Sequence, residues 1–157
     1  MKKTNAVRIL DNHKIPYELI AYEVDESDLS ATTLAEKLGQ NINQIFKTLV
    51  LRGTNTGIFV AVIPGHAEVD LKKAAKVSGN KKAEMVAMKE LLPLTGYIRG
   101  GCSPVGLKKP YPIFIHESCL DHETIYISAG KRGMQVKLQP QHLIDVTQAE
   151  VCDLVSQ

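Results

Sequence analysis

The chain has 157 residues, of which 44% are apolar and 23% charged, and its formal net charge at pH 7 is +2. This length and composition fit a globular protein with one sizeable core, and we expect a single domain over residues 1–157. No apolar run approaches the roughly 20 residues of a membrane-spanning helix, and no apolar leader follows the N-terminal lysines. We therefore expect an unprocessed, cytoplasmic protein without membrane contact.

Cysteine spacing and charge distribution narrow the range of functions. Cys102, Cys119 and Cys152 are odd in number and widely spaced, which argues against a disulfide framework. Residues 47–137 carry 14 Lys and Arg against 7 Asp and Glu, whereas the rest of the chain carries 5 against 10. Such a basic section could attract the phosphates of a nucleic acid, although a solvated lysine-rich face would have the same composition.

The first part of the chain alternates between short helical and strand-like patterns. Apolar residues at helical spacing predict a helix over 4–13 that ends before Pro16. Alternating apolar and polar residues predict a half-buried strand over 17–22. A second helix is predicted over 31–38, closed by Gly39.

Two strand-like runs follow at 46–51 and 58–63, and the glycine-bearing segment between them predicts a β-hairpin. Helices are predicted over 70–77 and over 87–92, and we expect the second to end before Pro93. The remaining predicted elements are three short strands and a helix, at 112–115, 124–128, 134–138 and 141–147. This mixture favours an α+β fold, with a mixed-sheet, barrel-like core flanked by helices, over a doubly wound parallel sheet.

The usual metal-binding and nucleotide-binding motifs do not occur in the sequence. The five histidines are scattered, and neither Cys-x-x-Cys nor His-Glu-x-x-His is present, so we predict no metal and no other cofactor. His116 and His122, near Cys119, are interpreted as parts of a solvated loop. The glycine patterns of dinucleotide binding and of nucleotide hydrolysis are also missing.

Two turn-prone segments, 100–104 and 126–133, lie beside apolar runs and offer small residues, backbone N–H groups and hydroxyls. Glycine lets a ligand approach the main chain closely, so both segments are candidates for holding a carbonyl or an anionic group. In the second segment, Lys131 and Arg132 could meet a phosphate. A plain basic hairpin turn explains that segment equally well.

Lys47 and Cys102 each have two interpretations. Lys47 lies among apolar residues at the start of a predicted strand, where its ammonium either faces solvent or stabilises an oxyanion inside a cavity. Cys102 could be a nucleophile, but Gly-x-Ser-x-Gly is absent and no base is in sight. A small side chain that fills space beside a tight turn explains Cys102 better.

Five motifs follow one another along the chain. They are Phe46-Lys47-Thr48-Leu49, Asp70-Leu71-Lys72-Lys73-Ala74-Ala75, Thr95-Gly96-Tyr97, Gly100-Gly101-x-Ser103-Pro104-x-Gly106 and Thr124-Ile125-Tyr126-Ile127-Ser128-x-Gly130-Lys131-Arg132-Gly133. Together they closely resemble the YbaK-type Cys-tRNA(Pro) deacylases, and the similarity runs from about residue 6 to residue 153, essentially the whole chain.

The resemblance implies a trans-editing enzyme that hydrolyses cysteine mischarged onto proline tRNA. It implies the mixed-sheet fold of the editing domain inserted in bacterial prolyl-tRNA synthetases, and makes that synthetase a partner. By matching position, Lys47 is the essential lysine, and Tyr22, Thr48, Gly101 and Ser128 line the pocket. The family is thought to need no protein nucleophile, because the substrate's own thiol attacks the ester carbonyl.

On this hypothesis Lys47 stabilises the carbonyl oxygen, and the backbone amides of Gly100 and Gly101 are further donors. The residues expected to bind the substrate are Tyr22, Thr48, Gly100, Gly101, Ser103 and Ser128, and those expected to contact tRNA phosphates are Lys131 and Arg132.

Two positions depart from the family pattern. Cys102 stands where an aliphatic residue is common, and Ala129 stands where glycine is common, so substrate preference is the open point. The alternatives are a deacylase of the same fold acting on another mischarged tRNA such as Ala-tRNA(Pro), a non-catalytic module that binds tRNA or the synthetase, and a small-molecule binder.

Overall fold

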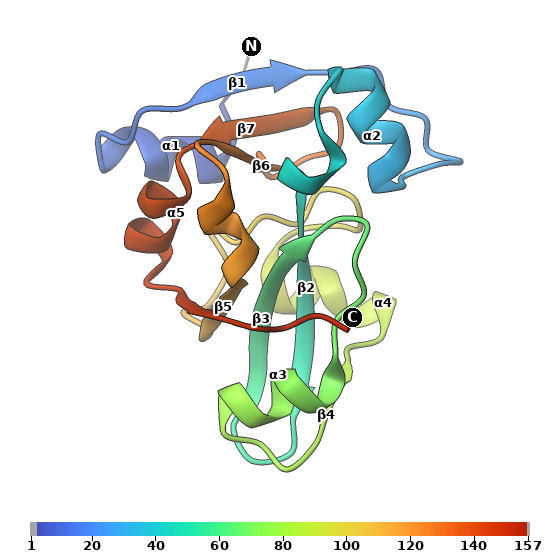
Figure 1. Ribbon diagram of the computed structural model, residues 1–157, viewed down its shortest axis with the longest axis vertical. Coiled ribbons are helices and arrows are strands. Elements are labelled where there is room, and N and C mark those ends of the chain that lie inside the picture. The colour runs from blue at the N-terminus through green and yellow to red at the C-terminus, as the bar shows by residue number, and fades with distance from the viewer. Residues whose placement is uncertain (1–2, 157) are drawn as a thin grey trace.

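Eight strands and five α-helices make up residues 3–156, the part of the chain that the computed structural model describes (Figure 1). The strands are β1 (Glu18–Ala21), β2 (Phe46–Gly53), β3 (Gly57–Pro64), β4 (Ala83–Met85), β5 (Ile113–His116), β6 (Ile125–Ser128), β7 (Met134–Leu138) and β8 (Glu150–Cys152). The helices are α1 (Asn5–Asn12), α2 (Ala31–Leu38), α3 (Leu71–Ser78), α4 (Met88–Thr95) and α5 (Pro140–Thr147), with 3-10 turns η1 (Ile42–Gln44) and η2 (Glu117–Asp121). Over residues 3–156, no helix is both long enough and apolar enough to cross a membrane.

The strands form two sheets that meet at one bridge. The smaller sheet has the order β1-β7-β6 and is antiparallel, whereas the larger has the order β4-β2-β3-β5-β8 and is mixed. Ile45, just before β2, pairs in parallel with Tyr126 of β6 and so joins the two sheets. The predicted α+β fold with a mixed sheet and flanking helices is confirmed; the strands within residues 3–156 form two joined open sheets rather than one closed barrel.

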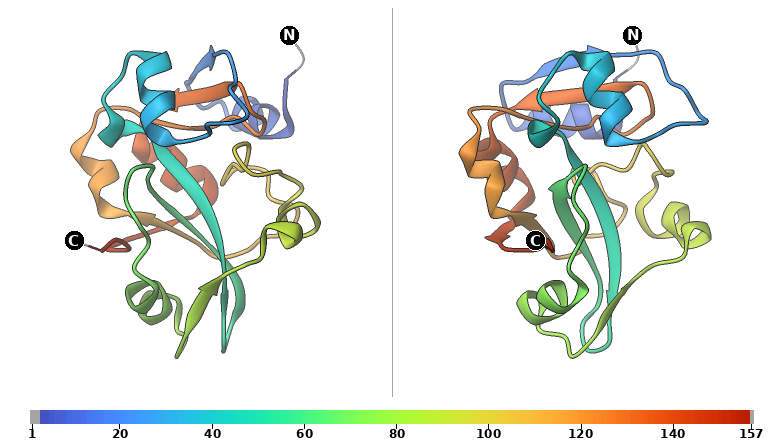
Figure 2. Two further views of the ribbon diagram at one scale, coloured as in Figure 1. Left: turned by 90° about the vertical axis from the view of Figure 1, so that its right-hand side faces the viewer. Right: turned by 45° about the vertical axis from the view of Figure 1, so that its right-hand side comes forward.

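The larger sheet buries apolar side chains on both of its faces. Phe46 and Val50 of β2 pack into a cluster with α1, whereas Leu51 packs on the opposite face with Ala74 of α3. Both views in Figure 2 show β2 between α3 and the segment around residue 100. All residues of β3 from Phe59 to Ile63 are buried, which is why this strand reads as a continuous apolar run instead of an alternating one.

The predicted elements all form, and three details differ. Helix α4 continues through Pro93 to Thr95, so the prediction that it ends before Pro93 is wrong. The ring removes a single N–H donor, and the Thr95 hydroxyl and the Gly96 amide still bond back to the Leu91 and Leu92 carbonyls. Strands β4 and β8 were not predicted, because three residues are too few to reveal a period.

The C-terminal segment is held against the larger sheet by side chains of β5 and α3. The Leu154 amide donates to Nδ1 of His116 at 3.1 Å, and Lys73 pairs with Asp153 at 2.8 Å. His116 is 9% exposed, and burial lowers its pKa below the usual 6.5 although the Asp153 carboxylate opposes this shift. His116 is therefore a neutral imidazole in the native structure.

Stability is expected to fall as the pH drops below 6.5, because His116 takes up a proton in the unfolded chain before it does so in the fold. The loss should be complete once the pH passes below the lowered pKa. Urea unfolding at about pH 7.5 and about pH 5 measures this difference. His116→Asn keeps an acceptor near the Leu154 amide but cannot titrate, so its stability should change less over the same interval; an equal change would contradict the assignment.

Candidate functional site

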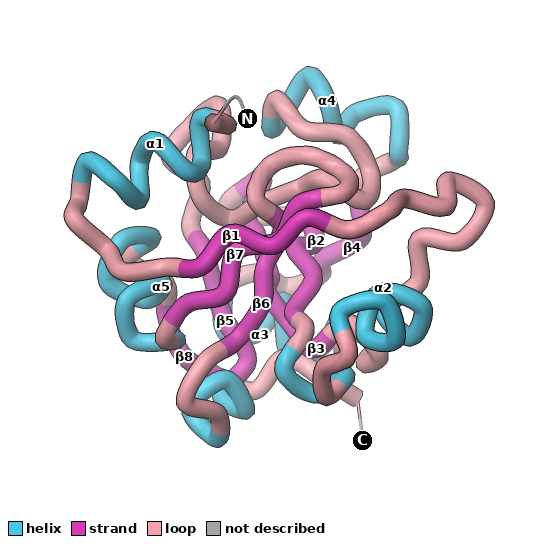
Figure 3. Tube along the Cα trace, turned by 90° about the horizontal axis from the view of Figure 1, so that it is seen from above, coloured by secondary structure: helices cyan, strands magenta, loops and turns pink. Residues whose placement is uncertain are grey.

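The predicted site residues lie on β2, on β6 and on the two glycine-bearing loops, around the place where the two sheets meet. Strands β2 and β6 contact each other beside the parallel bridge between Ile45 and Tyr126, and the view from above shows the two strands next to each other (Figure 3). Ile45 and Tyr126 both pack against Ala35 of α2. Two residues further along each strand, Lys47 and Ser128 project to the same side as this cluster, because side chains alternate along a strand.

Lys47 lies in the gap between two apolar clusters on one face of the larger sheet. Ile45 belongs to the cluster under α2, whereas Ile63, the direct cross-strand neighbour of Lys47, belongs to the cluster under α3. Lys47 is half-buried, and within residues 3–156 its ammonium makes no hydrogen bond. Burial lowers the pKa of Lys47, and the Glu68 carboxylate partly offsets that effect. The site thus contains a poorly solvated cation with donors to spare.

Thr48 projects from β2 to the opposite face from Lys47. Its cross-strand neighbour is Val62, and the side chains beside it on that face, Phe46 and Val50, belong to the main core. Thr48 is half-buried. Thr48 therefore points away from the side to which Lys47 projects.

The two glycine-bearing loops are packed against each other. A Cβ on Gly101 would lie 3.0 Å from Cα of Lys131 and 3.2 Å from the Arg132 nitrogen, so any other residue would push the two loops apart by a few tenths of an ångström. The Gly101 amide donates to the Ile98 carbonyl at 2.9 Å, and it is therefore already engaged within the loop. Gly100 has φ of +83° and lies against Leu29 and Arg132.

Some polar side chains of these loops form hydrogen bonds within the loop, and others are exposed. Ser103 is fully buried and its hydroxyl accepts from the Val105 amide, whereas the Ser128 hydroxyl accepts from the Gly130 amide at 3.1 Å. Lys131 is exposed. The structure therefore gives Ser103 a role in shaping its own turn and leaves Lys131 open to a ligand.

Arg132 and Tyr22 tie the N-terminal segment to this loop. Nε of Arg132 donates to the Arg99 carbonyl at 2.8 Å, and its guanidinium lies 3.7 Å from Glu26. The Tyr22 amide donates to the Gly133 carbonyl at 2.9 Å, and the Tyr22 side chain is half-buried. Arg132 thus joins three segments of the site, an arrangement that a run of basic residues does not reveal.

Gln135 is a polar residue of the site that the sequence reading missed. It lies in β7 directly opposite Ser128 and is 4% exposed. Its carbonyl oxygen Oε1 is buried and has no hydrogen-bond partner within residues 3–156. In the sequence Gln135 stands between Met134 and Val136, both of which belong to the main core. A single polar residue between two core residues is the feature that could have indicated it.

The positions that depart from the family pattern face the core. Cys102 is 8% exposed and Ala129 is fully buried, and both belong to the main apolar cluster. Burial raises the pKa of Cys102 to about 12, so its thiolate is scarce at neutral pH. Cys102 is thus a packing residue, as its sequence context indicated, and it does not line the pocket rim.

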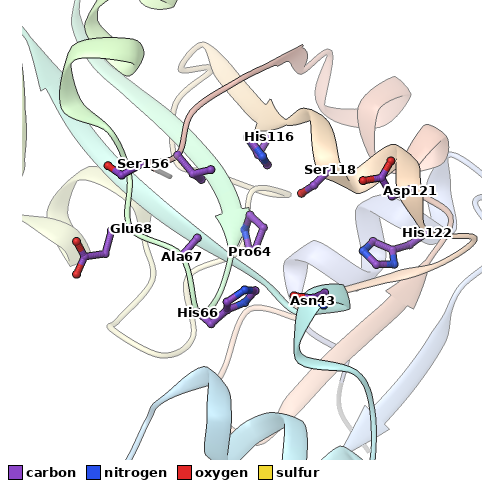
Figure 4. Close-up of a pocket in the computed structure, with 11 residues that line it drawn as sticks. Asn43, Pro64, His66, Ala67, Glu68, His116, Ser118, Asp121, His122 and Ser156 are labelled. Atoms are coloured by element: carbon purple, nitrogen blue, oxygen red, sulfur yellow. The ribbon is translucent and has the colours of Figure 1, made fainter.

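A separate cavity of about 640 Å³ opens between the end of β3, the turn η2 and the C-terminal segment. Figure 4 shows the His66 and His122 rings and the Ser118 hydroxyl bordering it; none of the predicted site residues lines it. His116 also lines this cavity and is buried, so the expectation that it lies in a solvated loop is wrong. Residues 3–156 contain no group of three His, Cys, Asp or Glu residues that could hold a metal ion.

The fold and the site define an aminoacyl-tRNA editing domain. Residues 26–146 match the family described by that name, and the chain belongs to it, which confirms the family that the motifs predicted. The chain is 48% identical over 155 residues to an Enterococcus faecalis protein provisionally named Cys-tRNA(Pro)/Cys-tRNA(Cys) deacylase EbsC, covering 99% of this chain and 94% of that protein. It is also 30% identical over 132 residues to YwhH of Bacillus subtilis, covering 82% and 83% of the two chains.

Solved structures agree on the fold. A crystal structure described provisionally as a trans-editing enzyme for prolyl tRNA synthetase superposes with a TM-score of 0.84 at 25% identity, covering 99% of this chain and 100% of that one. The hypothetical protein APE2540 superposes with a TM-score of 0.89 at 22% identity, covering 98% and 100%.

Proposed function

We propose that this protein is a trans-editing hydrolase that removes cysteine from mischarged Cys-tRNA(Pro). The observation that carries the proposal is the half-buried Lys47 ammonium, free of hydrogen bonds within residues 3–156 and two residues beyond the bridge that joins the two sheets, in a chain of the editing family. The name and the 48% identity of the E. faecalis relative support cysteine as the amino acid and proline tRNA as the carrier.

Lys47 stabilises the negative charge that develops on the ester carbonyl oxygen. Ser128 and Tyr22 orient the aminoacyl group by hydrogen bonds, and Gly100 and Gly101 shape the wall against which it lies. Thr48 packs on the other face of β2 and holds the strand in place behind Lys47. The substrate thiol attacks its own carbonyl carbon: the new S–C bond replaces the bond to the ribose oxygen, and the thiol proton passes to that oxygen. Water then opens the resulting thiolactone to free cysteine. No protein nucleophile takes part.

The tRNA acceptor end binds across the exposed side of the two loops. Lys131 meets its phosphates, and Arg132 adds positive charge while holding the loops together. Because phosphate contacts carry no sequence information, prolyl-tRNA synthetase is the partner that supplies tRNA selectivity. Residues 1–157 act as one editing domain in the cytoplasm.

Hydrolysis of Cys-, Ala-, Ser- and Pro-tRNA(Pro), measured in parallel, tests this function. We expect Cys-tRNA(Pro) to be hydrolysed about 10²-fold or more faster than Ser-tRNA(Pro), because a hydroxyl is a much weaker internal nucleophile than a thiol. Comparable rates on alanyl and cysteinyl esters would reject the thiol mechanism in favour of a deacylase with a wider or different substrate range. Binding of tRNA without hydrolysis of any ester would identify a non-catalytic module.

A further inference from the structure

Gln135 is a buried polar side chain of the site, and within residues 3–156 its side chain makes no hydrogen bond. Only 4% of it is exposed, and Oε1 is buried without a partner within residues 3–156. Buried polar atoms in native proteins are nearly always paired, so an unpaired acceptor next to a candidate site points to a donor on the ligand.

The sheet register places this acceptor inside the site. In the small sheet Gln135 lies between Ser128 of β6 and Ile20 of β1, directly opposite both. Directly paired residues project to the same face of a sheet. Ile20 packs against the cluster formed by Tyr126 and Ala35, so the face is the one that α2 covers, and it is the side to which Lys47 projects.

Gln135 adds a buried, unused acceptor to this side of the site. Lys47 is a cation and can only donate, and the Gly130 amide already occupies one of the two lone pairs of the Ser128 hydroxyl. An aminoacyl ester carries, beside its carbonyl, an α-ammonium group with three N–H donors. Lys47 repels that group, whereas the Gln135 carbonyl can accept from it.

We propose that Gln135 recognises the α-ammonium group of the aminoacyl ester; this inference rests on the proposed function. Lys47 and Gln135 then bind two different groups of the substrate. The ammonium of Lys47 binds the carbonyl oxygen, and the carboxamide of Gln135 binds the amino group. These two contacts fix the rotation about the bond between Cα and the carbonyl carbon, and with it the direction from which the thiol attacks.

Two substrates and three proteins test the assignment. The substrates are Cys-tRNA(Pro) and 3-mercaptopropionyl-tRNA(Pro), which keeps the thiol and the ester but lacks the amino group. The proteins are the wild type, Gln135→Met, which keeps length without an acceptor, and Gln40→Met, the same change at an exposed glutamine. Circular dichroism and thermal melting check that each variant folds.

Gln135→Met is expected to lower kcat/KM for Cys-tRNA(Pro) by about 10- to 100-fold, the range for a hydrogen bond to a charged group. It should leave the rate on the mercaptopropionyl ester within about twofold, and Gln40→Met should change neither rate. Equal losses on both esters, or no loss on Cys-tRNA(Pro), would overturn the role of Gln135.

The wild type alone provides a second test that needs no variant. If Gln135 binds the ammonium, the wild type should prefer the cysteinyl ester over the mercaptopropionyl ester by a factor similar to the loss in Gln135→Met. An equal rate on the two esters would refute the proposal even if Gln135→Met failed to fold. Failure of the wild type to hydrolyse either ester would instead reject the proposed function itself.

Discussion

Lys47→Ala is expected to lower kcat/KM for Cys-tRNA(Pro) hydrolysis by about 10²–10³-fold, the usual loss when one group that stabilises an oxyanion is removed. The ammonium is only partly solvated, so its attraction for a developing negative charge is stronger than that of a surface lysine. Single-turnover deacylation at saturating enzyme measures the effect on the chemical step. The protein should remain folded, because Lys47 makes no hydrogen bond within residues 3–156.

Two further variants sharpen this test. Lys76→Ala makes the same change at an exposed lysine of α3 within the basic section of the chain, and should leave the rate unchanged if local position matters more than overall charge. Lys47→Arg keeps the charge but spreads it over a larger group, and should recover only part of the activity. Unchanged turnover in Lys47→Ala would end the assignment of this residue.

Gly101→Val is expected to reduce both stability and activity. The new side chain would meet the backbone of Lys131 and Arg132, which cannot move aside as a flexible side chain can. Overpacking of this kind costs about 1–3 kcal/mol. Separating the loops should also move Ser128 and Lys131, so we expect deacylation to fall by about tenfold or more, as small displacements of positioning groups commonly do.

The control for Gly101→Val is Gly57→Ala. Gly57 has φ of +84° in the β2–β3 hairpin, with no other atom near its missing side chain, so alanine there should cost about 1–2 kcal/mol through backbone strain alone. Its folded fraction should deacylate normally. Urea unfolding and deacylation below the unfolding transition separate the two effects, and similar activity in both variants would show that the packed loops do not position the site.

Local patterns were enough to predict most elements, because each short helix or strand carries its own period or cap. Asp70 caps α3 with two backbone bonds and Gly39 closes α2 in the left-handed region, and both signals are visible in the sequence. Strand β8 could not be predicted, because its position depends on parallel pairing with β5, some 35 residues away. Pro93 led to a wrong prediction of the end of α4, because the missing N–H of one proline removes only one hydrogen bond from this two-turn helix.

The site was only partly accessible to the same reasoning. Motif spacing indicated Lys47 and the two glycine-bearing loops. Motifs do not show which backbone amides remain free to bind a ligand or which hydroxyls form hydrogen bonds within their own loop. Ser103 is buried in its own turn, and Gly101 lets the two loops approach closely. Gln135 was missed because its importance depends on the register between β6 and β7, which no local pattern specifies.

The bridge between Ile45 and Tyr126 also has a kinetic consequence. It joins segments about eighty residues apart, and contacts over such separations form slowly because the intervening chain must first be brought together. We therefore expect the hairpin β2–β3 to be protected from hydrogen exchange early in refolding, and the junction of the two sheets to be among the last regions to gain protection. Ligand binding should then appear only with the final refolding phase.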